Sequence, residues 1–235
     1  MLILACGLIS GLAGFAFGEY ALRLFAPSLE LPPGIRGDQV LAPREHARRL
    51  RVSQSQSATA SYSFLGAMLG LTLGAAGGLS RRSSHGALRA GLTGLILAAV
   101  AGAGATLLIL PLYHSLFRPP SADNATEQLA LALAMHGGIW MAIGALSGVA
   151  LGLGLGEGRI TRAVIGGILG AAVAAVAYEV GGAVLFPLDR TFEPMAITPA
   201  PRLMTHLAVG LCVSAATLWA TDHLKLGRDK PTSRT

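Results

Sequence analysis

The chain contains few charged residues and few aromatic residues for its length. Only 13% of its 235 residues are Asp, Glu, Lys or Arg, about half the share of a typical soluble domain. Its two cysteines, Cys6 and Cys212, lie in separate apolar runs, so neither a disulfide framework nor a paired-cysteine metal motif is expected. Phosphate-binding loops, dinucleotide-binding motifs and metalloprotease motifs are also missing. We therefore do not expect an enzyme.

The net charge of +6 does not indicate a nucleic-acid-binding protein. The basic residues lie in loops and at the C-terminal tail, and they form no basic helix face interleaved with aromatic residues. In a membrane protein, such residues mark the cytoplasmic side and attract anionic lipid headgroups. We expect the lipid bilayer, and not nucleic acid, to be the partner of these charges.

Long apolar runs are what the chain has in abundance, since 52% of its residues are hydrophobic. A helix needs about 20 such residues to cross a bilayer. Six runs are candidates: residues 2–25, 62–78, 87–110, 129–154, 163–186 and 203–221. The second run is short and could begin nearer Ala58. The prediction is an all-α polytopic transmembrane bundle of about six helices, with one domain over residues 1–222 and a basic tail over 223–235.

Three prolines suggest an internal repeat, because each ends an apolar run in the same register. Twenty residues before Pro27, Pro111 and Pro187 lie Gly7, Gly91 and Gly167, and eight residues before them lie Glu19, Ala103 and Glu179. The pattern predicts three repeated helical hairpins, at about 1–80, 86–156 and 161–222. Because each hairpin crosses the membrane twice, every hairpin starts on the same side of the membrane. An axis along the membrane normal would therefore relate the three copies.

Glycines recur every four residues in the second and fourth apolar runs. They are Gly66, Gly70, Gly74 and Gly78 in the second run, and Gly144, Gly148, Gly152 and Gly156 in the fourth. This spacing predicts a glycine zipper, a flat face on which a neighbouring helix backbone can approach closely. Two readings stay open, namely static packing within the monomer and a seam to other membrane subunits.

The short basic turns at residues 80–86 and 157–162 favour one orientation, with both termini in the cytoplasm. The location expected from these features is the inner membrane of a prokaryote. The polar segment 43–57 carries several arginines, and its sequence is typical of a short basic helix that lies on the membrane surface.

Four ionisable residues in the apolar runs, where charge is costly, are candidates for a site: Glu19, Glu179, His136 and His206. Both glutamates precede their prolines by eight residues, which is about 12 Å of helix. Arg23 follows Glu19 by one helical turn and is its expected ion-pair partner. Glu179 has no such local partner, so it is the stronger candidate for a functional residue.

The two histidines begin even-numbered helices at the face where the odd-numbered helices end, so all four residues share one half of the membrane. If they converge, they could bind a transition metal such as zinc, relay protons, or ligate a haem through the histidines. Alternatively, each could tie two helices together by hydrogen bonds. The spacing does not choose between these uses, so the metal and the cofactor stay unknown.

Two functions follow from these features. The first is a small transporter or permease for a cation, a proton-coupled solute or a small molecule, with an ion, proton or substrate site at Glu179, Glu19, His136 and His206. The second is a non-catalytic accessory or scaffolding subunit of a larger membrane protein complex. Small size, long glycine-rich faces and few functional motifs fit the second, whereas the cost of keeping Glu179 in the membrane without a use favours the first.

Overall fold

The computed structural model describes residues 1–28, 30–31, 34–35, 38–118 and 124–223, and this part of the chain is built from helices without a strand. The elements are α1 (Leu2–Leu24), α2 (Leu41–Ser80), α3 (Ser84–Leu116), α4 (Ala125–Leu155), η1 (Glu157–Arg159), α5 (Ile160–Leu185) and α6 (Pro199–His223). All six α-helices are long and apolar enough to span a membrane. The predicted fold class, a six-helix transmembrane bundle, is confirmed. Apart from His223, the predicted basic tail lies outside the described residues.

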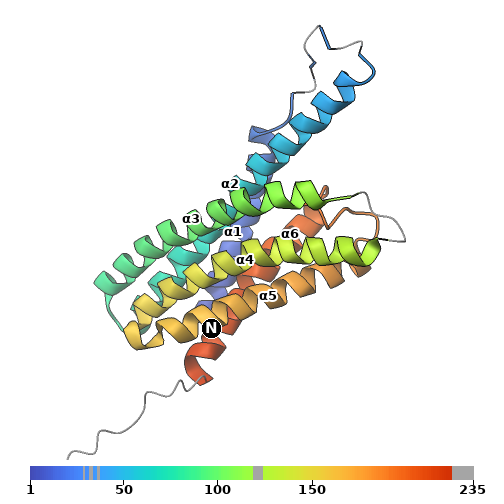
Figure 1. The fold of residues 1–235 in the computed structure, drawn as a ribbon. Coiled ribbons are helices and arrows are strands. Elements are labelled where there is room, and N and C mark those ends of the chain that lie inside the picture. Colours follow the sequence, from blue (N-terminus) through green and yellow to red (C-terminus); the bar gives the residue numbers. More distant parts are fainter. Residues whose placement is uncertain (29, 32–33, 36–37, 119–123, 224–235) are drawn as a thin grey trace, which may run out of the picture.

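The helices close a ring in chain order, because α6 packs against α1 as well as against α5 (Figure 1). Helices α2 and α4 also contact each other across the ring, whereas α6 barely touches either of them. The start of α1 and the end of α6 lie at one end of the bundle (Figure 1). The opposite end, where α1, α3 and α5 finish, is called the loop face here. The three-hairpin repeat stays a prediction, since the three even-numbered helices do not make equal contacts.

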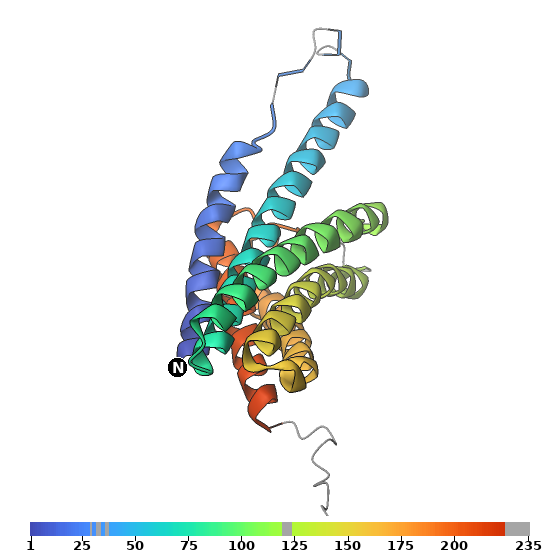
Figure 2. The same cartoon turned by 90° about the vertical axis from the view of Figure 1, so that its left-hand side faces the viewer.

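Helix α2 is much longer than the apolar run that predicted it. Its 40 residues extend about 60 Å, twice the hydrocarbon thickness of a bilayer. The first half of α2 projects past the other helices beside the end of α1 (Figure 2). The prediction of a separate surface helix at 43–57 is wrong, because these residues continue directly into the membrane span. No Gly or Pro lies between Pro43 and Gly66 to interrupt the helix.

Helix α3 passes through Pro111, which was predicted to end it, and continues to Leu116. A proline removes one backbone hydrogen bond and crowds the carbonyl one turn earlier, but membrane helices tolerate this interruption. The chain leaves the helix only at Phe117, whose backbone is extended. Pro27 and Pro187 do lie just beyond the ends of α1 and α5.

The glycine faces of α2 and α4 are turned toward other helices of the same chain. In α2, Gly66, Gly70, Gly74 and Gly78 lie against the α3 backbone at Ala98, Gly94, Ala90 and Ala87. In α4, Gly144, Gly148 and Gly152 lie against α5 at Gly167, Ala163 and Ile160. A methyl group at any of these seven glycines would collide with the facing backbone. Packing within the monomer therefore occupies these faces.

Residues 186–198, between α5 and α6, fold over the loop face and are called the cap loop here. The side chains of Thr191, Met195 and Ala196 are buried there. The Tyr62 hydroxyl donates to the carbonyl of Pro194 at 2.8 Å, and the Tyr113 hydroxyl donates to that of Phe192 at 2.8 Å. Two helices therefore hold the cap loop against the end of the bundle.

Candidate functional site

A buried ion pair joins α4 to α5. His136 Nδ1 lies 2.6 Å from Glu179 Oε1, and the two side chains are only 1% and 4% exposed. Glu179 lies on the face of α5 that also carries Ala171, Ala175 and Tyr178, and all four side chains are buried. With a proton on Nδ1, the imidazole donates to the carboxylate and leaves Nε2 as an acceptor. In the described part of the chain, this buried Nε2 has no hydrogen-bond partner.

Two large aromatic side chains pack around His136. The centre of the Trp140 ring lies 5.0 Å from that of His136, and the Tyr178 ring meets it edge-on at 5.2 Å. Trp140 is fully buried, and its indole Nε1 also lacks a partner among the described residues. An unpaired buried polar group costs about 1–3 kcal/mol. Each such atom in a native structure calls for an explanation, such as local strain, a functional role or a bound water or ion.

Glu179 is buried but lines a pocket at the loop face. A pocket of about 200 Å³ there is lined by Glu179, Gln128 and Thr191, together with the apolar residues Ala125, Leu129, Ala183 and Phe192. Gln128 is itself buried, and its Oε1 has no partner within the described residues. Glu179 therefore lines a mostly apolar pocket that also contains Gln128 and Thr191, whereas His136 belongs to the buried aromatic cluster.

Glu19 is held by Arg202 of α6, and not by Arg23 as predicted. Arg202 Nε donates to Glu19 Oε1 at 2.6 Å and Nη2 donates to Oε2 at 3.0 Å, a bidentate pair. Arg202 Nη1 also donates to the cap-loop carbonyls of Ala196 and Ile197 at 2.8 and 2.5 Å. Arg23 is exposed. The carboxylate of Glu19 instead points inward, toward α6.

His206 uses both of its ring nitrogens to tie helices together. Nδ1 donates to the carbonyl of Arg202 one turn earlier at 2.7 Å, and Nε2 accepts from the Ser61 hydroxyl of α2 at 3.0 Å. Its ring also stacks on Tyr62, with centres 6.4 Å apart. This arrangement matches the helix-tying alternative, and it leaves no nitrogen of His206 available for a haem iron.

The four predicted residues form two groups instead of one. Glu179 and His136 lie between α4 and α5, whereas Glu19 and His206 lie with Arg202 beside α1, α2 and α6. Tyr62 connects the groups, because its ring lies 6.4 Å from His206 and 6.5 Å from that of Trp140. Over the described residues there is no group of three or more His, Cys, Asp or Glu that could hold a metal ion. A single metal site built from all four residues is therefore wrong.

Sequence reasoning missed Arg202, Ser61 and Tyr62 as members of these groups. Arg202 directly precedes the predicted apolar run 203–221, so the sequence did not place it in a membrane helix. Two prolines, Pro199 and Pro201, mark the first turn of α6 in the structure. Proline is favoured at helix starts, and this signal could have placed Arg202 inside the helix.

Comparison of the chain with protein-family models, with curated proteins and with solved structures finds no match.

Proposed function

We propose that this integral membrane protein is a small transporter that moves a cation, a proton-coupled solute or a small molecule, with Glu179 and His136 as its exchange site. The observation that carries the proposal is the buried Glu179–His136 pair, because Glu179 also lines a pocket on the loop face. The proposal assigns no catalytic reaction to the chain. It keeps both termini in the cytoplasm of a prokaryote, so that the loop face is external.

The charge of the pair explains why protons and cations would compete for it. A neutral His136 beside an ionised Glu179 gives the pair a net charge of −1. One more proton on either partner makes the pair electrically neutral. When that proton leaves, a net negative charge stays behind in a low-dielectric interior, at a large cost. A cation bound beside Glu179 would remove this cost. Exchange of one proton for one positive charge is therefore the chemistry that suits this pair.

The route from the pair to the opposite face is closed by apolar side chains. Leu69, Leu73, Ile143 and Leu151 are all completely buried in the interior of the bundle. Transport therefore requires a second conformation, as in other carriers that alternate access around a central site. The close contacts between α4 and α5 through Gly144 and its neighbours offer smooth surfaces for such a movement.

The test is proton flux into vesicles that contain the purified protein and a pH-sensitive dye, driven by gradients of individual cations. Glu179→Gln keeps an oxygen that accepts from His136 but cannot exchange a proton. We expect its flux to fall to that of protein-free vesicles, while its thermal stability stays close to wild type. Glu127→Gln is the matched control, because Glu127 is exposed in the first turn of α4 and should be dispensable.

Wild-type flux through Glu179→Gln would show that the site assignment is wrong. No flux of the wild-type protein with any cation tested would remove the support for cation exchange and favour the second function. That second function, an accessory subunit, is favoured by the projecting half of α2, which extends past the bundle (Figure 2). It predicts that other membrane proteins co-purify in mild detergent and are lost when residues 41–50 are replaced by a short linker.

A further inference from the structure

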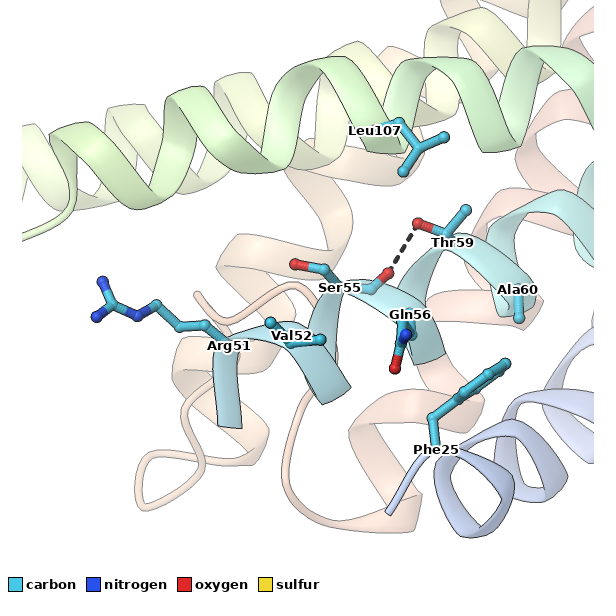
Figure 3. A pocket seen from close by; sticks show the side chains of 8 residues that line it. All are labelled: Phe25, Arg51, Val52, Ser55, Gln56, Thr59, Ala60 and Leu107. Carbon is cyan, nitrogen blue, oxygen red and sulfur yellow. Dashed lines mark hydrogen bonds between the residues drawn. The ribbon is translucent and has the colours of Figure 1, made fainter. Parts of the chain in front are cut away.

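A groove lies between α2 and α3, away from the Glu179–His136 pair, and has a volume of about 470 Å³. This volume falls within the range of roughly 300–1,000 Å³ that is usual for small-molecule sites. Figure 3 shows Leu107 of α3 on one side of the groove and Phe25, just after α1, on the other. Residues of α2 form its floor, namely Arg51, Val52, Ser55, Gln56, Thr59 and Ala60.

The groove opens onto the surface that faces lipid. Leu107 is 61% exposed, and its neighbours Leu108 and Leu112 on α3 are 78% and 60% exposed. Because these side chains are large and apolar, their exposure is consistent with contact to acyl chains. A ligand would thus reach the groove sideways from the bilayer.

One end of the groove is polar and cationic. Arg51 lies nine residues before Ala60 on α2, a separation of about 13 Å along the helix. Its neighbours Arg48 and Arg49 share the carboxylate of Glu45. For Arg51, the described residues provide no carboxylate within ion-pair distance, and its Nε makes only a long bond of 3.4 Å to the carbonyl of Ala47. In Figure 3 its guanidinium extends away from the apolar end.

We propose that this groove binds an anionic phospholipid, with the phosphate group at Arg51 and an acyl chain along Phe25, Ala60 and Leu107. Arginine suits this role because its planar fork of N–H groups matches phosphate oxygens. Ala60 of the floor and the side chains of Phe25 and Leu107 suit the upper part of the acyl chain. The separation of about 13 Å between Arg51 and Ala60 along α2 suits a molecule that reaches from the headgroup layer into the hydrocarbon layer.

The experiment is native mass spectrometry of the purified protein with phosphatidylglycerol or phosphatidylcholine added in equal amounts. We expect wild type to bind phosphatidylglycerol more tightly, and Arg51→Gln to weaken that binding about fivefold, the effect of one basic residue near an anionic surface. Arg44→Gln, a change of the same charge two turns away and outside the groove, should leave binding unaltered. Ala60→Phe fills the apolar part and should weaken the binding of both lipids.

The proposal is overturned if Arg51→Gln keeps the wild-type preference, or if Arg44→Gln weakens binding equally, which would indicate diffuse surface attraction. It is also overturned if Ala60→Phe binds both lipids normally while its melting temperature matches wild type. Inorganic phosphate at millimolar concentration should not displace the lipid, and displacement would point to a free phosphate instead. A photo-crosslinker at Leu107 that captures a protein from native membranes, and no lipid, would identify the groove as a subunit contact.

Discussion

Removing the carboxylate of Glu19 should destabilise the bundle strongly. In Glu19→Gln, Arg202 loses two short charge-assisted bonds but stays buried at the end of α6. Breaking a buried pair from one side costs about 3–5 kcal/mol. The Glu19 side chain is 27% exposed, so solvent moderates the loss. We expect a decrease of about 2–3 kcal/mol in the free energy of unfolding.

The structure also predicts that the two partners are coupled. Arg202→Gln should cost a similar amount, since it removes the pair and the two bonds to the carbonyls of Ala196 and Ile197. The double variant, Glu19→Gln with Arg202→Gln, leaves no unpaired charge at this position. Its loss in free energy of unfolding should therefore be smaller than the sum of the two single losses by about 1.5–3 kcal/mol.

The assay is reversible unfolding in mixed micelles, followed by circular dichroism as the fraction of denaturing detergent rises. The same preparations are then tested for proton flux. A coupling energy below about 0.5 kcal/mol would refute the reasoning, since this is the deviation expected of independent sites. A Glu19→Gln variant of normal stability but without flux would also refute it, because Glu19 would then belong to the exchange site.

Two further predictions concern packing and the cap loop. Gly70→Ala places a methyl group against the backbone of α3 and should lower the free energy of unfolding by about 1–3 kcal/mol. At Gly104 an added methyl group has no other atom within 4 Å, so Gly104→Ala should raise the free energy of unfolding by up to about 1 kcal/mol. Equal effects of the two changes in the micelle assay would contradict this packing of α2 on α3. Tyr62→Phe and Tyr113→Phe should each lower the free energy of unfolding by about 1–2 kcal/mol and speed amide hydrogen exchange at Phe192, Glu193 and Met195. The change Tyr20→Phe, at an exposed position, should do neither. Unchanged exchange in both would mean that the hydroxyls do not hold the loop.

The membrane helices were predictable from the sequence because a bilayer requires long apolar segments and internally satisfied backbones. The run 2–25 became α1, Leu2–Leu24, and the run 163–186 became most of α5, Ile160–Leu185. The start of α2 was missed for a physical reason. Apolarity marks where a helix enters lipid, whereas the helix itself continues wherever the backbone has no breaker. Most of the residues before Tyr62 are polar, so the apolar run does not include them, yet they belong to the same continuous helix.

The pairing of the candidate site was only partly predictable. Local rules assigned Arg23 to Glu19, because residues one turn apart on a helix are neighbours. The true partner, Arg202, lies 183 positions later, and only the packing of α1 on α6 brings it near. Glu179 was singled out because it lacked a local partner, and its contact with His136 likewise depends on how α4 packs against α5. Sequence spacing carries little information about such contacts between helices.

The two glutamates show how one position can serve two chemistries. Glu19 and Glu179 each precede a proline by eight residues, yet one meets arginine and the other meets histidine. Arginine stays charged at every accessible pH, so its pair with Glu19 has a fixed charge and can only hold helices together. Histidine can both donate and accept through its two ring nitrogens, so its pair with Glu179 is the one that suits the exchange proposed above. The choice of partner, more than the position of the carboxylate, therefore separates a structural tie from a site suited to exchange.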